Sequence, residues 1–99
     1  MASDQLESGE MPAEASLLLR RKRALYRAQH RGTKEMDWMV GKFAEGHLFT
    51  MTLESLVHFE KFLEVGDTEL HSWLFGTASC RDPLFALLVQ DIRRFNSLS

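Results

Sequence analysis

The sequence predicts an all-α protein, a compact five-helix bundle with a flexible, disordered acidic tail at its N-terminus. Apolar residues recur at helical spacing in five segments, and glycines, a proline or capping residues separate these segments. No run of alternating β-branched residues and no Asn-Gly or Asp-Gly hairpin signal is present. With 99 residues the chain makes one domain at most, so we expect a tail over residues 1–15 and a helical domain over residues 16–99.

The first two predicted helices differ in the clarity of their patterns. Ser16 is the expected N-cap of a first helix that runs to about His30 and buries Leu18, Leu25 and Ala28. The second helix has a stripe at i, i+3, i+4, i+7, i+8 and i+11, which the apolar residues Met36, Met39, Val40, Phe43 and Ala44 form and His47 continues at its edge. Its other face is expected to carry Asp37, Gly41 and Glu45.

Capping residues set the bounds of the third and fourth helices. Thr50 or Thr52 caps the third helix, and Gly66 ends it. The third helix is expected to bury Leu53, Leu56, Phe59, Phe62 and Leu63. Asp67 is the expected N-cap of a short fourth helix, which Gly76 closes.

The fifth helix begins at a strong start signal. Asp82 supplies an N-cap, and Pro83 stands at the first helical position, where a missing N–H costs nothing. The side chains expected to face inward are Leu84, Leu87, Leu88, Ile92 and Phe95.

The charge is distributed unevenly along the chain, although the net charge is only −2. No acid occurs from residue 15 to residue 34, where seven of the 12 basic residues lie: Arg20, Arg21, Lys22, Arg23, Arg27, Arg31 and Lys34. A basic face on an acidic body should steer the molecule toward an acidic partner surface.

The sequence contains no pattern typical of an enzyme, a metal site or a nucleotide site. The four histidines are dispersed, Cys80 is the single cysteine, and the glycines form neither a phosphate-binding nor a dinucleotide loop. We therefore predict no catalytic residue, no metal and no stably bound cofactor. A small enzyme acting through Cys80 is the weakest alternative, because no histidine base lies near it in sequence.

The segment from His30 to Glu35 is a charged link between two helices with Gly32 at its centre. Glycine allows another backbone to approach closely, and Arg31 offers a rigid fork of donors to a carboxylate or carbonyl. Glu35 could orient Arg31 or meet a cation of a partner. The alternative is purely structural, with Gly32 ending one helix and Glu35 favoured by the dipole of the next.

Two motifs in this chain resemble the succinate dehydrogenase assembly, or flavinylation, factor family of the bacterial SdhE type. The first is Arg31-Gly32-x-x-Glu35, followed by Met36-Asp37 and an amphipathic helix. The second is the block Phe59-x-x-Phe62-Leu63-Glu64-x-x-Asp67-x-x-Leu70-x-x-Trp73-Leu74. Together they cover roughly residues 18–76.

The resemblance implies a five-helix fold and a role as a chaperone. Such a factor binds the flavoprotein subunit of succinate dehydrogenase, in some bacteria that of fumarate reductase, and promotes covalent attachment of FAD to a histidine there. The Arg-Gly-x-x-Glu surface contacts the flavoprotein, which carries over to Arg31, Gly32 and Glu35. The predicted partner-binding set also includes Arg27, His30 and Asp37. We expect Gly32→Arg to abolish partner binding while the fold survives.

The alternative function is a regulatory or nucleic-acid-binding helical module that uses the basic first helix. The domain's negative net charge and the single aromatic residue in that helix, Tyr26, argue against it, so no nucleic-acid partner is expected. No apolar stretch approaches the roughly 20 residues that span a bilayer, and residues 1–14 lack the positive charge of a targeting peptide. We therefore expect a cytoplasmic bacterial protein without membrane insertion, and a monomer.

Overall fold

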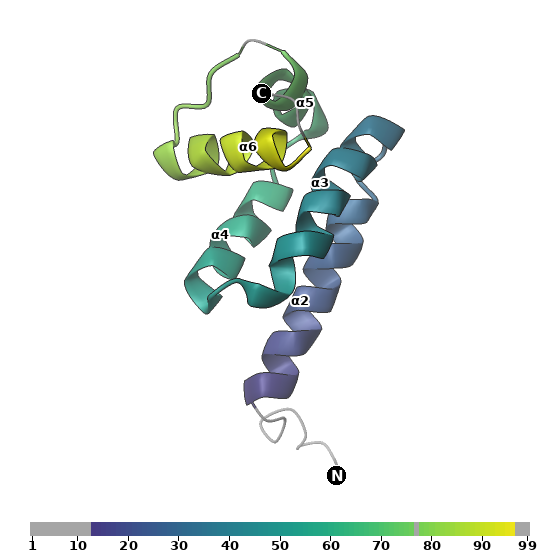
Figure 1. Ribbon diagram of the computed structural model, residues 1–99, viewed down its shortest axis with the longest axis vertical. Helices are drawn as coiled ribbons and strands as arrows, with labels where there is room; N and C mark the ends of the chain where they lie inside the picture. Colours follow the sequence, from purple (N-terminus) through teal and green to yellow (C-terminus); the bar gives the residue numbers. More distant parts are fainter. Residues whose placement is uncertain (1–12, 77, 97–99) are drawn as a thin grey trace.

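The computed structural model describes residues 13–76 and 78–96, and Figure 1 shows how its helices are arranged. Five α-helices and one short 3-10 helix make up the described elements. Their bounds are Ala13–Gln29 for α2, Lys34–His47 for α3, Leu48–Thr50 for the 3-10 helix η1, Leu53–Leu63 for α4, Asp67–Phe75 for α5 and Pro83–Phe95 for α6. No described residue belongs to a strand, so the predicted all-α class and the five helices are confirmed.

Helix α2 begins at Ala13, and the prediction that Ser16 caps it is wrong. Alanine and glutamate are strong helix formers, and the residues at positions 13–15 extend the helix by almost one turn. Ser16 therefore lies inside α2. The remainder of the predicted tail, residues 1–12, lies outside the described residues.

Helices α2 and α3 lie side by side along the long axis of the molecule (Figure 1). Gly41 makes this close approach possible, because a Cβ atom there would lie 3.0 Å from Cγ and 3.3 Å from Cα of Gln29. Gly41 is buried, so the expectation that it faces away from the protein is wrong. Because Gly41 has no side chain, it did not count in the apolar pattern. The same absence of a side chain allows α2 to pack against it.

The core lies between the α2–α3 pair and the three later helices. Helix α4 packs on α2, and α6 packs on both α3 and α5. Figure 1 shows α6 lying crosswise beside α3, above α4 and next to α5. The large side chains that are fully buried are Phe59, Phe62, Met36, Leu48, Leu56, Leu63, Leu70, Leu74, Ile92 and Val40. No polar or charged residue is buried in the described part of the chain.

The predicted inner face of α6 is only partly correct. Leu88 is half-buried and Ile92 is buried, but Leu84, Leu87 and Phe95 are exposed. Phe85 and Val89 lie on the face of α6 that packs against the core. Residues 84–89 are all apolar, so periodicity alone does not select one face of this helix. Leu18 and Leu53, also expected in the core, are exposed as well.

Several predicted helix boundaries are confirmed, but α4 ends at Leu63, before the predicted Gly66. Thr52 caps α4, because its side chain accepts a hydrogen bond from the N–H of Ser55. The carboxylate of Asp82 accepts from the N–H groups of Leu84 and Phe85 and caps α6. Gly76 follows the last residue of α5, as expected. These local signals work because a cap requires only residues within one helical turn.

Candidate functional site

The turn between α2 and α3, residues 30–33, has a backbone that only glycine adopts easily. Gly32 has φ = +126°, in a region that L side chains rarely adopt. A Cβ atom at this position would also lie 3.2 Å from Oδ2 of Asp67. Glycine is therefore needed here for the chain's own conformation, in addition to any approach by a partner.

Polar groups at the start of α3 hold the backbone of this turn. Oδ1 of Asp37 accepts hydrogen bonds from the N–H of Arg31 and, at 3.2 Å, from the N–H of Gly32. Thr33 is the N-cap of α3, and its Oγ1 accepts from the N–H of Met36 at 3.2 Å. Asp37 thus faces the turn, and its carboxylate is occupied by the chain's own backbone.

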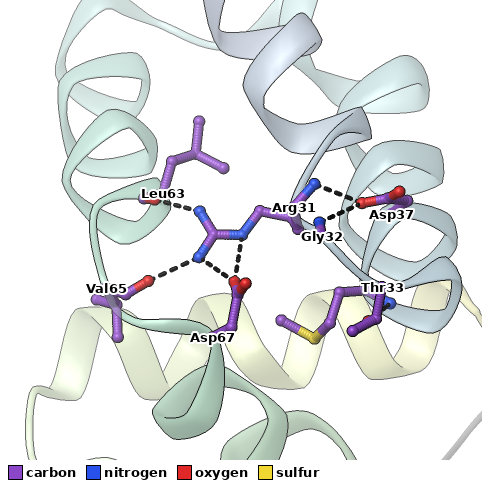
Figure 2. Close-up of polar contacts among 8 residues, drawn as sticks. Arg31, Gly32, Thr33, Asp37, Leu63, Val65 and Asp67 are labelled. Carbon is purple, nitrogen blue, oxygen red and sulfur yellow. Dashed lines mark hydrogen bonds and ion pairs between the residues drawn. The ribbon is translucent and has the colours of Figure 1, made fainter.

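The Arg31 side chain crosses from this turn to the turn between α4 and α5 (Figure 2). Its Nη1 donates to the carbonyl of Leu63, and its Nη2 donates to the carbonyl of Val65 at 2.7 Å. Nε and Nη2 also donate to Oδ1 of Asp67, at 3.1 Å and 2.7 Å. Only 10% of the side chain remains exposed. Arg31 therefore joins two turns that lie far apart in the sequence.

This arrangement stabilises the ends of two helices. The last carbonyl groups of an α-helix have no hydrogen-bond partner within the helix. Arg31 donates to the carbonyl of Leu63, the last residue of α4, and to the carbonyl of Val65, two residues beyond it. Asp67 is the first residue of α5, where a negative charge is favoured by the helix dipole. The N-cap of α5 is Gly66, so the prediction that Asp67 caps this helix is wrong. The Asp67 carboxylate binds Arg31 instead.

The predicted partner-binding residues divide into two groups. Arg27, His30, Gly32 and Glu35 are exposed around the turn. Arg31 and Asp37 are half-buried, and their polar groups bind other parts of the chain. Glu35 does lie in the first turn of α3, but the groups that hold Arg31 are Asp37 and Asp67. Glu35 forms no ion pair or hydrogen bond with its side chain among the described residues, so it is available to an external group.

An open groove of about 530 Å³ lies beside the Arg31 side chain. Tyr26, Arg27 and His30 form its α2 wall, and residues 63–67 form the opposite wall. The ring of His30 stacks on that of Tyr26 with 4.0 Å between centroids, and Nδ1 of His30 lies 2.7 Å from the carbonyl oxygen of Tyr26. The predicted residues Arg27 and His30 therefore border a concave surface, and Tyr26 holds the His30 ring in place.

The basic residues of α2 do not form one uniform surface. Nε of Arg20 donates to Oε2 of Glu60 at 3.2 Å, and the two side chains form an ion pair. The hydrogen bond and the charge of Glu60 raise the pKa of Arg20 above its ordinary value. Arg21 donates to the carbonyl of Leu48 at 2.6 Å. Within the described residues, Lys22 and Arg23 make no such contact. Fewer cations are thus available for an external anion than the sequence suggested.

Sequence reasoning missed Thr33 as a cap and the pairing of Arg31 with Asp67. The Thr33-x-x-Met36 spacing in front of an apolar stripe could have indicated the cap. The ion pair joins residues 36 positions apart, and no local pattern in a single sequence indicates such a contact.

Other chemical features of the described residues are sparse. No group of three or more histidine, cysteine or acidic side chains in this part of the chain is placed to hold a metal ion. Cys80 is half-buried, and its Sγ lies 3.6 Å from the carbonyl oxygen of Asp82. None of the described helices is long and apolar enough to cross a membrane.

Comparison with known proteins connects this geometry to a family. A curated relative from Acetobacter pasteurianus, "FAD assembly factor SdhE", is 42% identical over 82% of this chain and 78% of its own length. A protein of the same name from Shewanella oneidensis is 33% identical over 67% of this chain and 80% of its own length. The "Succinate dehydrogenase assembly factor 2, mitochondrial" of Lodderomyces elongisporus is 33% identical over 56% of this chain and 34% of its own length.

No solved structure matches the chain significantly. The family model described as "Flavinator of succinate dehydrogenase" matches residues 22–96, which include the turn at Gly32, the groove beside it and all of α3 to α6. The chain therefore belongs to the succinate dehydrogenase flavinator family.

Proposed function

We propose that this protein binds the flavoprotein subunit of succinate dehydrogenase in the bacterial cytoplasm and promotes covalent attachment of FAD to that subunit. Family membership and the names of the bacterial relatives support this proposal. The structural observation that carries it is the turn at Gly32. Its backbone and its arginine are held from inside, while Arg27, His30, Gly32 and Glu35 remain exposed to a partner.

A turn held in this way suits a surface that recognises a folded protein. Ordering a flexible loop at an interface costs free energy, and this turn is already ordered by Asp37 and Arg31. The exposed groups are the guanidinium of Arg27, the imidazole of His30, the backbone of Gly32 and the carboxylate of Glu35. They would bind a partner surface that presents carboxylates to Arg27 and a cation to Glu35.

The proposed role is to position the partner, and this chain contributes no reacting group. The bond to FAD would form between the flavin and a histidine of the flavoprotein, both outside this chain. By binding the flavoprotein, this chain would favour the arrangement in which these two groups meet, which lowers the entropic part of the barrier. We expect the chain to hold no FAD by itself, to act as a monomer and to catalyse no reaction alone.

The proposal is tested by expressing a bacterial succinate dehydrogenase flavoprotein subunit with and without this chain. Covalently attached flavin remains on the denatured subunit and is read as fluorescence on a gel. We expect the fluorescence to rise when the chain is present. The flavoprotein of fumarate reductase can be tested in parallel as an alternative partner.

A matched pair of charge reversals locates the contact. Glu35 and Glu54 are both exposed, and both stand at the second residue of a helix, so reversal costs each helix a similar dipole interaction. We expect Glu35→Arg to lower covalent flavin and flavoprotein binding by about tenfold. Glu54→Arg, on α4, should leave both unchanged.

Two results would contradict the proposal. If the unmodified chain neither binds a flavoprotein nor raises its fluorescence, the function is wrong. If Glu35→Arg and Glu54→Arg act alike while the chain itself is active, the turn is not the contact surface.

A further inference from the structure

Two large aromatic side chains beside the turn at Gly32 are exposed. Among the large hydrophobic residues that the structure describes, Tyr26 and Trp38 are the most exposed, at 64% and 61%. Tyr26 lies in the last turns of α2, and Trp38 lies in the second turn of α3. They therefore flank the turn at Gly32 from its two helices.

Each aromatic side chain is a helical neighbour of a residue already placed in the proposed contact surface. Tyr26 and His30 are four positions apart, and their rings stack at 4.0 Å with an interplanar angle of 23°. Glu35 and Trp38 are three positions apart in α3, a spacing that puts them on the same side of a helix. The two aromatic residues therefore extend the proposed contact surface on either side of the turn.

Both side chains are also braced by their surroundings. Tyr26 is held by its stack on His30, and the Nζ of Lys42 lies 4.7 Å from the centroid of the Trp38 ring. A braced aromatic ring loses little conformational entropy on binding and offers a large apolar area to a partner. Exposure by itself would be weak evidence, because Leu84 on α6 is 58% exposed. Residue type, bracing and position together distinguish the two aromatics.

We infer that Tyr26 and Trp38 are the two aromatic anchors through which this surface binds the flavoprotein, one on each side of the turn. This inference rests on the proposed function and deepens it. Trp and Tyr, with Arg, are the residues most enriched among those that dominate interface energetics. The inference adds residues to the contact surface that the Arg-Gly-x-x-Glu motif does not contain.

The charges around the two rings define the chemistry of the partner. A surface hollow of about 360 Å³ on α2 is lined by Tyr26 and three cations, Lys22, Arg23 and Arg27. Tyr26 and Arg27 line the groove beside Arg31 as well, so the hollow adjoins the groove. On α3, the cation beside the Trp38 ring is Lys42, which also forms an ion pair with Glu45 at 3.8 Å. The fitting partner surface therefore has two apolar recesses, and carboxylates border the recess that receives Tyr26.

Binding measurements with the full chain and a purified flavoprotein subunit test the inference. We expect Trp38→Ala and Tyr26→Ala each to weaken binding by about tenfold or more. Tyr26→Phe keeps the ring and its stack on His30, and should retain most of the affinity. Leu84→Ala removes an apolar side chain of similar exposure from α6 and should bind as the unmodified chain does.

Fluorine NMR supplies a readout that a change in stability would not produce. The chain has two tryptophans, so labelling with 5-fluorotryptophan should give two resonances, which a Trp38→Phe variant assigns. Trp73 packs against the core and serves as an internal reference. On addition of the unlabelled flavoprotein, the Trp38 resonance should shift, and the Trp73 resonance should shift less.

The outcomes separate this inference from the function on which it rests. Absence of binding by the unmodified chain would overturn both. Normal binding by the unmodified chain, together with full affinity of Trp38→Ala and Tyr26→Ala and an unmoved Trp38 resonance, would overturn the aromatic anchors alone. Loss of affinity in both alanine variants but not in Leu84→Ala would support them.

Discussion

Nη2 of Arg31 lies 2.7 Å from Oδ1 of Asp67, and this ion pair fastens the α2–α3 turn to the α4–α5 turn. The same guanidinium donates to the carbonyl oxygens of Leu63 and Val65. Arg31 is the most strongly bound residue of the Arg-Gly-x-x-Glu motif, and its bonds point into the molecule. Its first effect is to keep the neighbouring turn in one position. Its contribution to partner binding would then act through Gly32 and Glu35.

Removing the Arg31 side chain should cost substantial stability. We expect Arg31→Ala to lower the free energy of unfolding by about 2–3 kcal/mol, because two carbonyls and a carboxylate lose a charged donor. Urea denaturation followed by far-UV circular dichroism measures this change. Asp67→Asn keeps an acceptor oxygen and should cost less. If Arg31→Ala unfolds at the same urea concentration as the unmodified chain, the bonds to the α4–α5 turn contribute nothing.

Alanine substitutions at two glycines should differ in their effect on stability. Gly32→Ala forces an L side chain to φ = +126° and places its Cβ 3.2 Å from Asp67, so we expect a loss of about 1–3 kcal/mol. Gly66 has φ = −63°, and a methyl group there would meet no atom within 4 Å, but alanine is less favourable than glycine at an N-cap. The gain in backbone entropy and the capping loss oppose each other, so Gly66→Ala should change the free energy of unfolding by less than about 1 kcal/mol. Thermal unfolding of the two variants distinguishes these effects, and equal stability of both would contradict the strained-turn explanation.

The same geometry changes the expectation for Gly32→Arg. An arginine would bring the backbone strain of any L residue as well as bulk at the contact surface. Loss of flavoprotein binding in this variant therefore would not by itself separate a lost contact from a distorted turn. The exposed Glu35 and the aromatic rings of Tyr26 and Trp38 are the cleaner probes.

Salt should weaken the encounter with the flavoprotein through the cations that remain free. Arg23 is exposed and makes no ion pair within the described residues, whereas Arg20 is paired with Glu60. Arg23→Gln and Arg20→Gln remove the same formal charge. We expect Arg23→Gln to slow association at low salt by about two- to threefold and to flatten its salt dependence, because unpaired charge steers diffusing partners. Stopped-flow or surface-based kinetics at several salt concentrations would measure this.

In this prediction Arg20→Gln serves as the control. Its charge is already balanced by Glu60, so its effect on the association rate should be smaller. Equal slowing by the two variants would mean that net charge, and not the face of α2 around Tyr26, governs the encounter.

The sequence alone determined the helical class, several helix boundaries and the large side chains on the inner face of α3. Those features depend on residues within one or two helical turns, such as Thr52 before Ser55 or Asp82 before Pro83. The Arg31-Gly32-x-x-Glu35 motif also located the turn at the centre of the proposed site. Four of the six predicted partner-binding residues are exposed, since they lie in or beside a polar link.

The tertiary structure alone decided which apolar residues are buried and what the polar ones bind. Residues 84–89 of α6 are all apolar, and only packing against the other helices selects Phe85 and Val89 over Leu84 and Leu87. The Phe85 ring, for example, contacts aromatic rings on both α4 and α5. Gly41 is buried because α2 packs against it, and Asp67 binds Arg31 because folding brings the two turns together. Contacts between residues distant in the sequence depend on how whole helices pack, and a local pattern in one sequence contains no record of that packing.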